Sequence, residues 1–297
     1  MVSGIKTRAF PEHNYYAIWH DGVTIRIKLN STKPIEELRH PEFFDVKLTS
    51  YCDSGRDRNG RGCYFCYQDS TKTSPHFENV INKIKNFFGS MSKNEKPFQV
   101  AIGGGEPTSH PDFIAALQAF HALDICPNYT TNGMFVAEPK CHDIIRATKE
   151  LCGGVAVSTH SHLEKYWRVA TEKLLASDIK TNFHIIISGK RSIDELMKLR
   201  AEYSDHIKYF VLLPYTAQGR AKKKLIEWDY LQSQTEHDMS GIAFGANFYP
   251  YLVSSTLNIS LYEPEILSKY LDLEGSGTLY KSSFSVDVPV RENIFRE

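Results

Sequence analysis

The amino-acid sequence predicts an α/β fold, a partial (β/α)6 barrel of the TIM type with parallel strands. Short runs rich in β-branched and aromatic residues alternate, about six times, with segments of helical hydrophobic spacing. Such alternation requires a parallel sheet with helices packed against it. Chemically unusual stretches follow several of the expected strands directly, where functional groups collect in folds of this kind. The alternation therefore predicts the fold class, and the unusual stretches locate a candidate site.

The expected elements of the barrel follow one another without interruption. In the first expected helix, helical spacing relates Val80, Ile81, Ile84, Phe87 and Phe88. Pro111 suits the first turn of the second helix, where a missing N–H costs little. The expected strands are 44–50, 98–103, 126–133, 155–160, 181–188 and 207–215, and the expected helices are 78–91, 111–123, 139–151, 162–177 and 192–204.

The two ends of the chain differ from this pattern. Residues 14–30 predict a β-hairpin, because Asp21-Gly22 is a strong turn pair between two apolar runs. Near the C-terminus, residues 240–263 and 277–288 favour extended segments. No change in composition marks a linker, so we expect one domain with three parts. These are an N-terminal hairpin extension (1–43), a core (44–221) and a C-terminal extension (222–297) that caps the site.

Composition excludes some classes of function. The 297 residues have a formal net charge of zero, which gives no general attraction to nucleic acids or anionic membranes. No apolar run reaches the roughly 18 residues of a membrane span. The first residues do not resemble a signal peptide. We therefore expect a cytoplasmic protein with reduced thiols, whose six cysteines are ligands, catalytic groups or buried apolar residues.

Three cysteines lie together in the stretch that follows the first expected strand. Cys63 and Cys66 have the spacing CxxC, and Cys52 precedes them across ten residues. A structural zinc site normally uses four ligands, and His76 is the nearby candidate for the fourth. A [4Fe–4S] cluster normally uses four thiolates, so three protein ligands leave one iron open to another molecule. The remaining cysteines, at 126, 141 and 152, are expected to be small buried side chains.

A glycine-rich segment, GGGEPT (103–108), follows the second expected strand. Consecutive glycines let a backbone approach a ligand closely and permit positive φ, and we expect them to have no packing role. Glu106 places a carboxylate at the same point, which suits a ligand amine. The segment lacks the G-K-[ST] ending of a phosphate-binding loop, and a carboxylate would repel phosphate.

The cysteines and GGGEPT, in this order, resemble the radical S-adenosylmethionine (radical SAM) superfamily over residues 44–221. The resemblance implies that Cys52, Cys63 and Cys66 bind a [4Fe–4S] cluster whose open iron binds S-adenosylmethionine (AdoMet). The common family spacing is CxxxCxxC, whereas the first gap here is longer and consists of loop-forming residues. The residues that match cofactor-binding positions of the family are Phe65, Gly103, Gly104, Gly105, Glu106, Asn132, Ser158, His160 and Leu213.

The resemblance also implies an activity: reductive cleavage of AdoMet to a 5′-deoxyadenosyl radical, which abstracts hydrogen from a substrate. The sequence does not identify the substrate, and a small molecule or nucleobase is favoured over a peptide. Arg220, Tyr249 and Tyr251 are the candidate substrate-binding residues. The implied partner is an external one-electron reductant of the flavodoxin or ferredoxin type. No cysteine follows Cys152, which favours a single cluster.

A second interpretation is a non-catalytic iron–sulfur or zinc-binding protein on the same scaffold. The GGGE segment distinguishes the two interpretations, because a metal site alone does not need an AdoMet-binding strand end.

Overall fold

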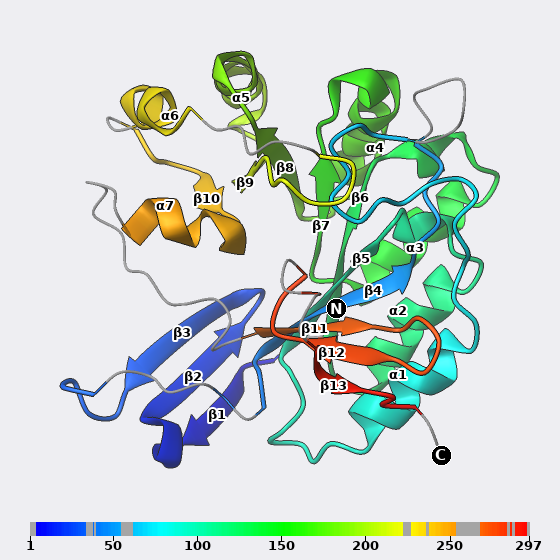
Figure 1. The fold of residues 1–297 in the computed structure, drawn as a ribbon, viewed down its shortest axis with the longest axis vertical. Coiled ribbons are helices and arrows are strands. Elements are labelled where there is room, and N and C mark those ends of the chain that lie inside the picture. Colours follow the sequence, from blue (N-terminus) through cyan, green and yellow to red (C-terminus); the bar gives the residue numbers. More distant parts are fainter. Residues whose placement is uncertain are drawn as a thin grey trace.

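The computed structural model describes residues 4–33, 38, 40–54, 62–221, 227–235, 238–253, 268–283, 286 and 289–295. Its centre is a ten-stranded sheet with the order β10-β9-β8-β7-β6-β5-β4-β11-β12-β13 (Figure 1). The six strands predicted for the barrel are β4 to β9, and each is parallel to its neighbour. Their bounds are Phe43–Thr49, Gln99–Gly104, Cys126–Thr131, Gly154–Ser158, Thr181–Ile187 and Phe210–Pro214.

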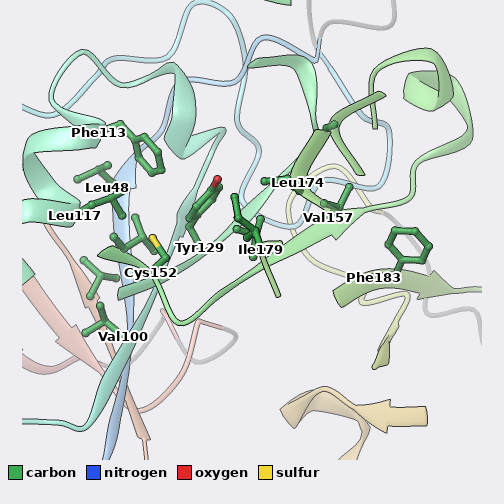
Figure 2. Packing of buried hydrophobic residues seen from close by; sticks show 14 of the residues in the cluster. Leu48, Val100, Phe113, Leu117, Tyr129, Cys152, Val157, Leu174, Ile179 and Phe183 are labelled. Atoms are coloured by element: carbon green, nitrogen blue, oxygen red, sulfur yellow. The ribbon is translucent and has the colours of Figure 1, made fainter. Parts of the chain in front are cut away.

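Five helices cover one face of this sheet (Figure 1). They are α1 (Val80–Gly89), α2 (Phe113–Ala122), α3 (Cys141–Leu151), α4 (Glu164–Ala176) and α5 (Lys190–Tyr203). Alternate residues of the strands pack against them in the main hydrophobic core, as Leu48, Val100 and Phe183 do in Figure 2. The residues between these point to the opposite side of the sheet, here called the inner face. No helix in the described part of the chain is both long and apolar enough to cross a bilayer.

The N-terminal residues form a separate three-stranded antiparallel sheet, β1-β2-β3. The predicted hairpin is confirmed as β2 (Tyr15–His20) and β3 (Val23–Lys28), and positive φ at Asp21 and Gly22 forms its turn. The sequence analysis missed β1 (Lys6–Phe10), whose five residues alternate too briefly to be recognised. Tyr15 and Trp19 of β2 are buried in a second, smaller hydrophobic cluster.

The described C-terminal residues extend the central sheet at both of its ends. Strand β10 (Ile242–Phe244) is parallel to β9, and β11 (Ser268–Asp272) is parallel to β4. Strands β12 (Thr278–Tyr280) and β13 (Pro289–Glu292) continue antiparallel from β11. Helix α6 (Trp228–Thr235) precedes β10.

The prediction of extended structure for residues 240–263 is wrong in part. After β10 the chain forms the 3-10 helix η5 (Ala246–Phe248) and the helix α7 (Tyr249–Val253). Aromatic contacts explain the difference, because Phe248 and Tyr251 both pack on Trp228 of α6. Residues 254–267, part of the extension expected to cap the site, lie outside the described residues, so the cap stays a prediction.

Candidate active site at the carboxyl ends of the strands

The thiol groups gather directly after β4. The Cys52 Sγ lies 2.9 Å from the Ser54 Oγ, and the same hydroxyl lies 3.4 Å from the Cys63 Sγ. The backbone N–H of Cys66 donates to the Cys63 carbonyl at 3.2 Å, which forms the turn of the CxxC pair. Cys66 also raises the pKa of the Cys63 thiol, in addition to the larger effect of burial. Residues 55–61 of the intervening loop lie outside the described residues, yet both of its ends meet at one place.

The surroundings of these cysteines fit metal ligands, because their thiols would lose their protons only when a metal binds. Burial raises the pKa of the Cys52 thiol to about 12 and raises that of Cys63. Both groups are therefore protonated near neutral pH, whereas a coordinating thiol is deprotonated. Three thiols from one loop match the donor chemistry of an iron–sulfur cluster.

A mononuclear zinc site receives less support. Among the described residues, no group of three His, Cys, Asp or Glu side chains is placed to hold a single metal ion. The nearby candidate His76 instead bonds the Thr49 hydroxyl through Nδ1 at 3.0 Å, and its ring lies 4.5 Å from that of Tyr51. In a cluster each cysteine binds a different iron, so its ligand sulfurs lie farther apart than around one ion.

Arg220, which follows the last barrel strand, contacts the loop that carries Cys52, Cys63 and Cys66, here called the cysteine loop. Its guanidinium donates to the Cys63 carbonyl, the Ser70 carbonyl and the Asp69 carboxylate, each at 2.8 Å. Its backbone N–H also donates to the Cys66 carbonyl at 3.0 Å. Each guanidinium nitrogen thus has a partner in the loop. The structure therefore favours a bracing role for Arg220 over the substrate contact expected from the sequence.

Two of the three glycines have a packing role, contrary to the expectation from the sequence. A Cβ on Gly105 would lie 1.9 Å from the Tyr51 carbonyl oxygen, and one on Gly104 would lie 2.3 Å from that of Thr49. The N–H groups of Gly105 and Glu106 donate to these same carbonyls at 2.8 Å. Gly104 and Gly105 thus let the backbone entering the cysteine loop pass across the end of β5. Gly103 differs, because a Cβ there would meet no atom within 4 Å.

Glu106 is buried and accepts several hydrogen bonds. Oε1 accepts from the Thr108 hydroxyl at 2.6 Å, the Thr131 hydroxyl at 2.8 Å and, more weakly, the Thr108 N–H at 3.3 Å. Oε2 accepts from the Asn132 N–H at 2.7 Å. Burial, and then the neighbouring Asp53 carboxylate, raise the pKa of Glu106, and these donors oppose the rise. An approaching ligand amine would further favour the charged carboxylate.

Asn132 links this carboxylate to the cysteine loop. Its side-chain amide donates to the Asp53 carboxylate at 3.0 Å and lies 3.9 Å from the Cys52 Sγ. Asp53 also accepts from the Ser109 hydroxyl at 3.2 Å. The sequence analysis missed Asp53 and Ser54, which directly follow Cys52 in the predicted motif and were treated only as loop formers.

Aromatic contacts bring the end of β7 to the same site. The Phe65 ring lies 4.8 Å from the His160 ring, and His160 stacks on His162 at 5.8 Å. His162 Nε2 lies 3.2 Å from the Cys63 Sγ, although the sequence analysis did not single it out. The repeated histidine in STHSH was the available signal. Burial, and then the histidines at 162 and 184, lower the pKa of His160 to about 3, so the ring is neutral.

The remaining candidates occupy varied positions. Ser158 ends β7, and Leu213 lies half-buried near the end of β9. Tyr249 and Tyr251 belong to α7, beyond the barrel strands, and Tyr251 packs in the aromatic cluster described above. No described contact joins either tyrosine to the thiols. Cys126 and Cys152 are buried as expected, whereas Cys141 is only half-buried on α3.

Solved structures share this fold at low sequence identity. SuiB of Streptococcus suis bound to the precursor peptide SuiA has a TM-score of 0.66 and 17% identity, with 88% of this chain and 64% of that chain covered. SuiB bound to S-adenosylmethionine has a TM-score of 0.60 and 17% identity, with coverages of 82% and 60%. The chain thus spans less than two thirds of the SuiB chain. The anSMEcpe structure with AdoMet and the Cp18Cys peptide has a TM-score of 0.54 and 14% identity, with coverages of 83% and 75%.

Sequence comparisons add no relative. No protein-family model matches the chain, and a search of curated proteins finds no match. The likeness to these structures confirms the predicted α/β fold, a partial barrel of parallel strands.

Proposed function

We propose that the chain is a radical SAM enzyme. Cys52, Cys63 and Cys66 would hold a [4Fe–4S] cluster, and the segment from Gly103 to Glu106 would bind AdoMet. A bound cluster would supply one electron for the cleavage of AdoMet to methionine and a 5′-deoxyadenosyl radical, which would take a hydrogen atom from the substrate. The roles of the protein residues are to bind, orient and shield these groups.

One observation carries this proposal: Asn132 connects the cysteine loop to the glycine-rich segment that ends in Glu106. Its N–H donates to Glu106, while its side-chain amide donates to Asp53 and faces Cys52. Two motifs separated by about forty residues therefore form one polar site. A protein that only binds metal has no need for a buried carboxylate beside its thiols.

The substrate class remains broad in this proposal. Small molecules and nucleobases were favoured from the sequence, and the peptide-bound SuiB and anSMEcpe structures support peptides as a further class. A low-potential one-electron reductant of the flavodoxin or ferredoxin type would serve all of these classes.

The test is anaerobic reconstitution followed by iron and sulfide analysis. Wild type should bind about four of each per chain, and Cys52→Ala, Cys63→Ala and Cys66→Ala should each lose most of this iron. Cys141→Ala is the matched control, since this half-buried thiol lies on α3 outside the loop. Loaded wild type should form 5′-deoxyadenosine from AdoMet and dithionite. Full iron loading in Cys52→Ala, or no AdoMet cleavage by loaded wild type, would refute the proposal.

A further inference from the structure

Asp45 places a carboxyl group on the inner face of the sheet, on the strand that leads into the cysteine loop. Its neighbours Phe44 and Val46 are buried in the helix-facing core, so the alternation of β4 turns Asp45 to the other side. Burial raises the pKa of Asp45 to about 7, and no neighbouring cation in the described structure lowers it. Within the described residues, the carboxylate accepts no hydrogen bond.

Glu106 is a buried carboxylate in the same protein that does have hydrogen-bond donors around it. It accepts hydrogen bonds from Thr108, Thr131 and Asn132. Burying a carboxylate without such partners is costly. Asp45, which is half-buried, therefore carries a cost of burial that no described contact of the folded protein relieves.

Two phenols flank this carboxylate. Tyr270 of β11 is the Cα partner of Asp45 in the parallel register. Tyr67 directly follows Cys66, and its hydroxyl accepts from the Gln68 amide at 2.8 Å. Burial is the largest cause of the raised pKa of both phenols. The Asp45 charge is a smaller cause for both, so both lie near it; for Tyr270 the Asp272 charge acts more strongly. Tyr67 thus connects the cysteine loop to the surroundings of Asp45.

The nearby lysines have other partners. Lys47, the next inner-face residue of β4, bonds Asp272 at 3.0 Å and Glu274 at 3.4 Å. Burial lowers the pKa of Lys83, and the charges of Asp272, Glu78 and Glu274 oppose this. Its amine donates to a backbone carbonyl at 2.8 Å. Both lysines therefore face carboxylates other than Asp45, and neither has a described contact with Asp45.

Strand β5, which lies beside Asp45 and Lys47 of β4, leaves room for a ligand. Ala101 and Gly103 of β5 pair with Asp45 and Lys47, so small residues lie next to both charged side chains. The space beside Gly103 is open, since a Cβ there would meet no atom within 4 Å. Gly103 also begins the segment proposed to bind AdoMet, so Asp45 and Lys47 lie beside the proposed cofactor site.

We propose that Asp45, flanked by Tyr67 and Tyr270, binds a cationic nitrogen of the substrate, either a primary ammonium or a guanidinium group. This inference rests on the proposed function, because it assigns the ligand to the substrate of that site. A cation would supply the missing counter-charge through a charge-assisted hydrogen bond. The inference applies equally to a lysine or arginine side chain in a peptide and to a small amine.

The test measures binding of small cations and their neutral analogues to cluster-loaded protein. The probes are methylguanidinium and n-butylammonium, compared with N-methylurea and 1-butanol, by saturation-transfer NMR under anaerobic conditions and constant ionic strength. Wild type should bind each cation about tenfold more tightly than its neutral analogue, and Asp45→Asn should lose this preference. Asp143→Asn, which changes an exposed carboxylate on α3, should keep it.

Further measurements distinguish a failure of this inference from a failure of the proposed function. AdoMet affinity and iron content are determined on the same samples, and Asp45→Asn should leave both unchanged. Equal binding of cations and neutral analogues by wild type, or an unchanged preference in Asp45→Asn, would overturn the inference. Lower AdoMet affinity in Asp45→Asn would also overturn it, because the ligand amine would then belong to the cofactor. Absent iron in wild type would instead refute the proposed function, whereas the cation measurements test Asp45 directly.

Discussion

Replacing Asp45 by Asn should stabilise the folded protein, and the gain should depend on pH. Burial raises the pKa of Asp45 from 3.8 to about 7. A raised folded-state pKa contributes stability below the unfolded pKa, and this contribution is lost as pH rises through the folded pKa. One pKa unit corresponds to about 1.4 kcal/mol, so ionisation of Asp45 costs the folded state up to about 4 kcal/mol above neutral pH. Asn has a similar shape and avoids this cost.

The free energy of unfolding should be measured by urea denaturation of metal-free wild type and Asp45→Asn, between about pH 4.5 and pH 8.5. The advantage of Asp45→Asn should be smallest at the acidic end, grow up to about pH 7 and then level off. Asp143→Asn should show no comparable rise, because its carboxylate is exposed. The flanking Tyr67 stays protonated throughout, since burial raises its pKa to about 12. An advantage that is constant, or that falls as pH rises, would refute the assignment of Asp45 as a desolvated carboxyl.

Three further predictions concern the residues that shape the site. Gly105→Ala should lower the free energy of unfolding by about 2–4 kcal/mol, because its Cβ would clash with a backbone carbonyl, while Gly103→Ala should stay within about 1 kcal/mol of wild type in the same urea assay. Glu106→Ala should cost about 2–4 kcal/mol by leaving buried donors without an acceptor, and calorimetry below its unfolding temperature should also show weaker AdoMet binding. Arg220→Ala should make the chain near Cys66 more sensitive to protease, whereas Arg146→Ala, which breaks an exposed pair, should not. Unchanged cleavage in Arg220→Ala would contradict the bracing role.

The regular part of the fold could be predicted because its signals are local. Each barrel strand and helix has a periodic apolar pattern, and the observed bounds differ from the expected ones by only a few residues. The C-terminal strands could not be predicted in this way. Strand β11 inserts next to β4, and this parallel pairing joins residues more than two hundred positions apart. Helix α7 depends on aromatic packing against α6, which no local pattern reveals.

The candidate site also has features that the sequence could predict and features that it could not. The cysteine and glycine motifs were visible in the sequence, and the structure brings them together. The internal role of Gly105 was not visible, because it depends on how close the Tyr51 carbonyl lies. Asp45 was passed over for a related reason. In FDVKLTS its alternation with apolar residues predicts a strand, and only its surroundings show that it has no hydrogen-bond partner among the residues that the structure describes.

The cysteine loop also explains how a long gap before the CxxC pair is compatible with one site. The N–H of Cys52 donates to the Thr71 carbonyl at 2.9 Å, which fixes the start of the loop. Arg220 fixes its other end through the carbonyls of Cys63 and Cys66. These anchors lie outside the intervening loop, so its length adds little entropic cost and does not set the positions of the thiols. The unusual spacing is therefore a property of the connecting loop, while the arrangement of the cysteines is determined by the barrel and by Arg220.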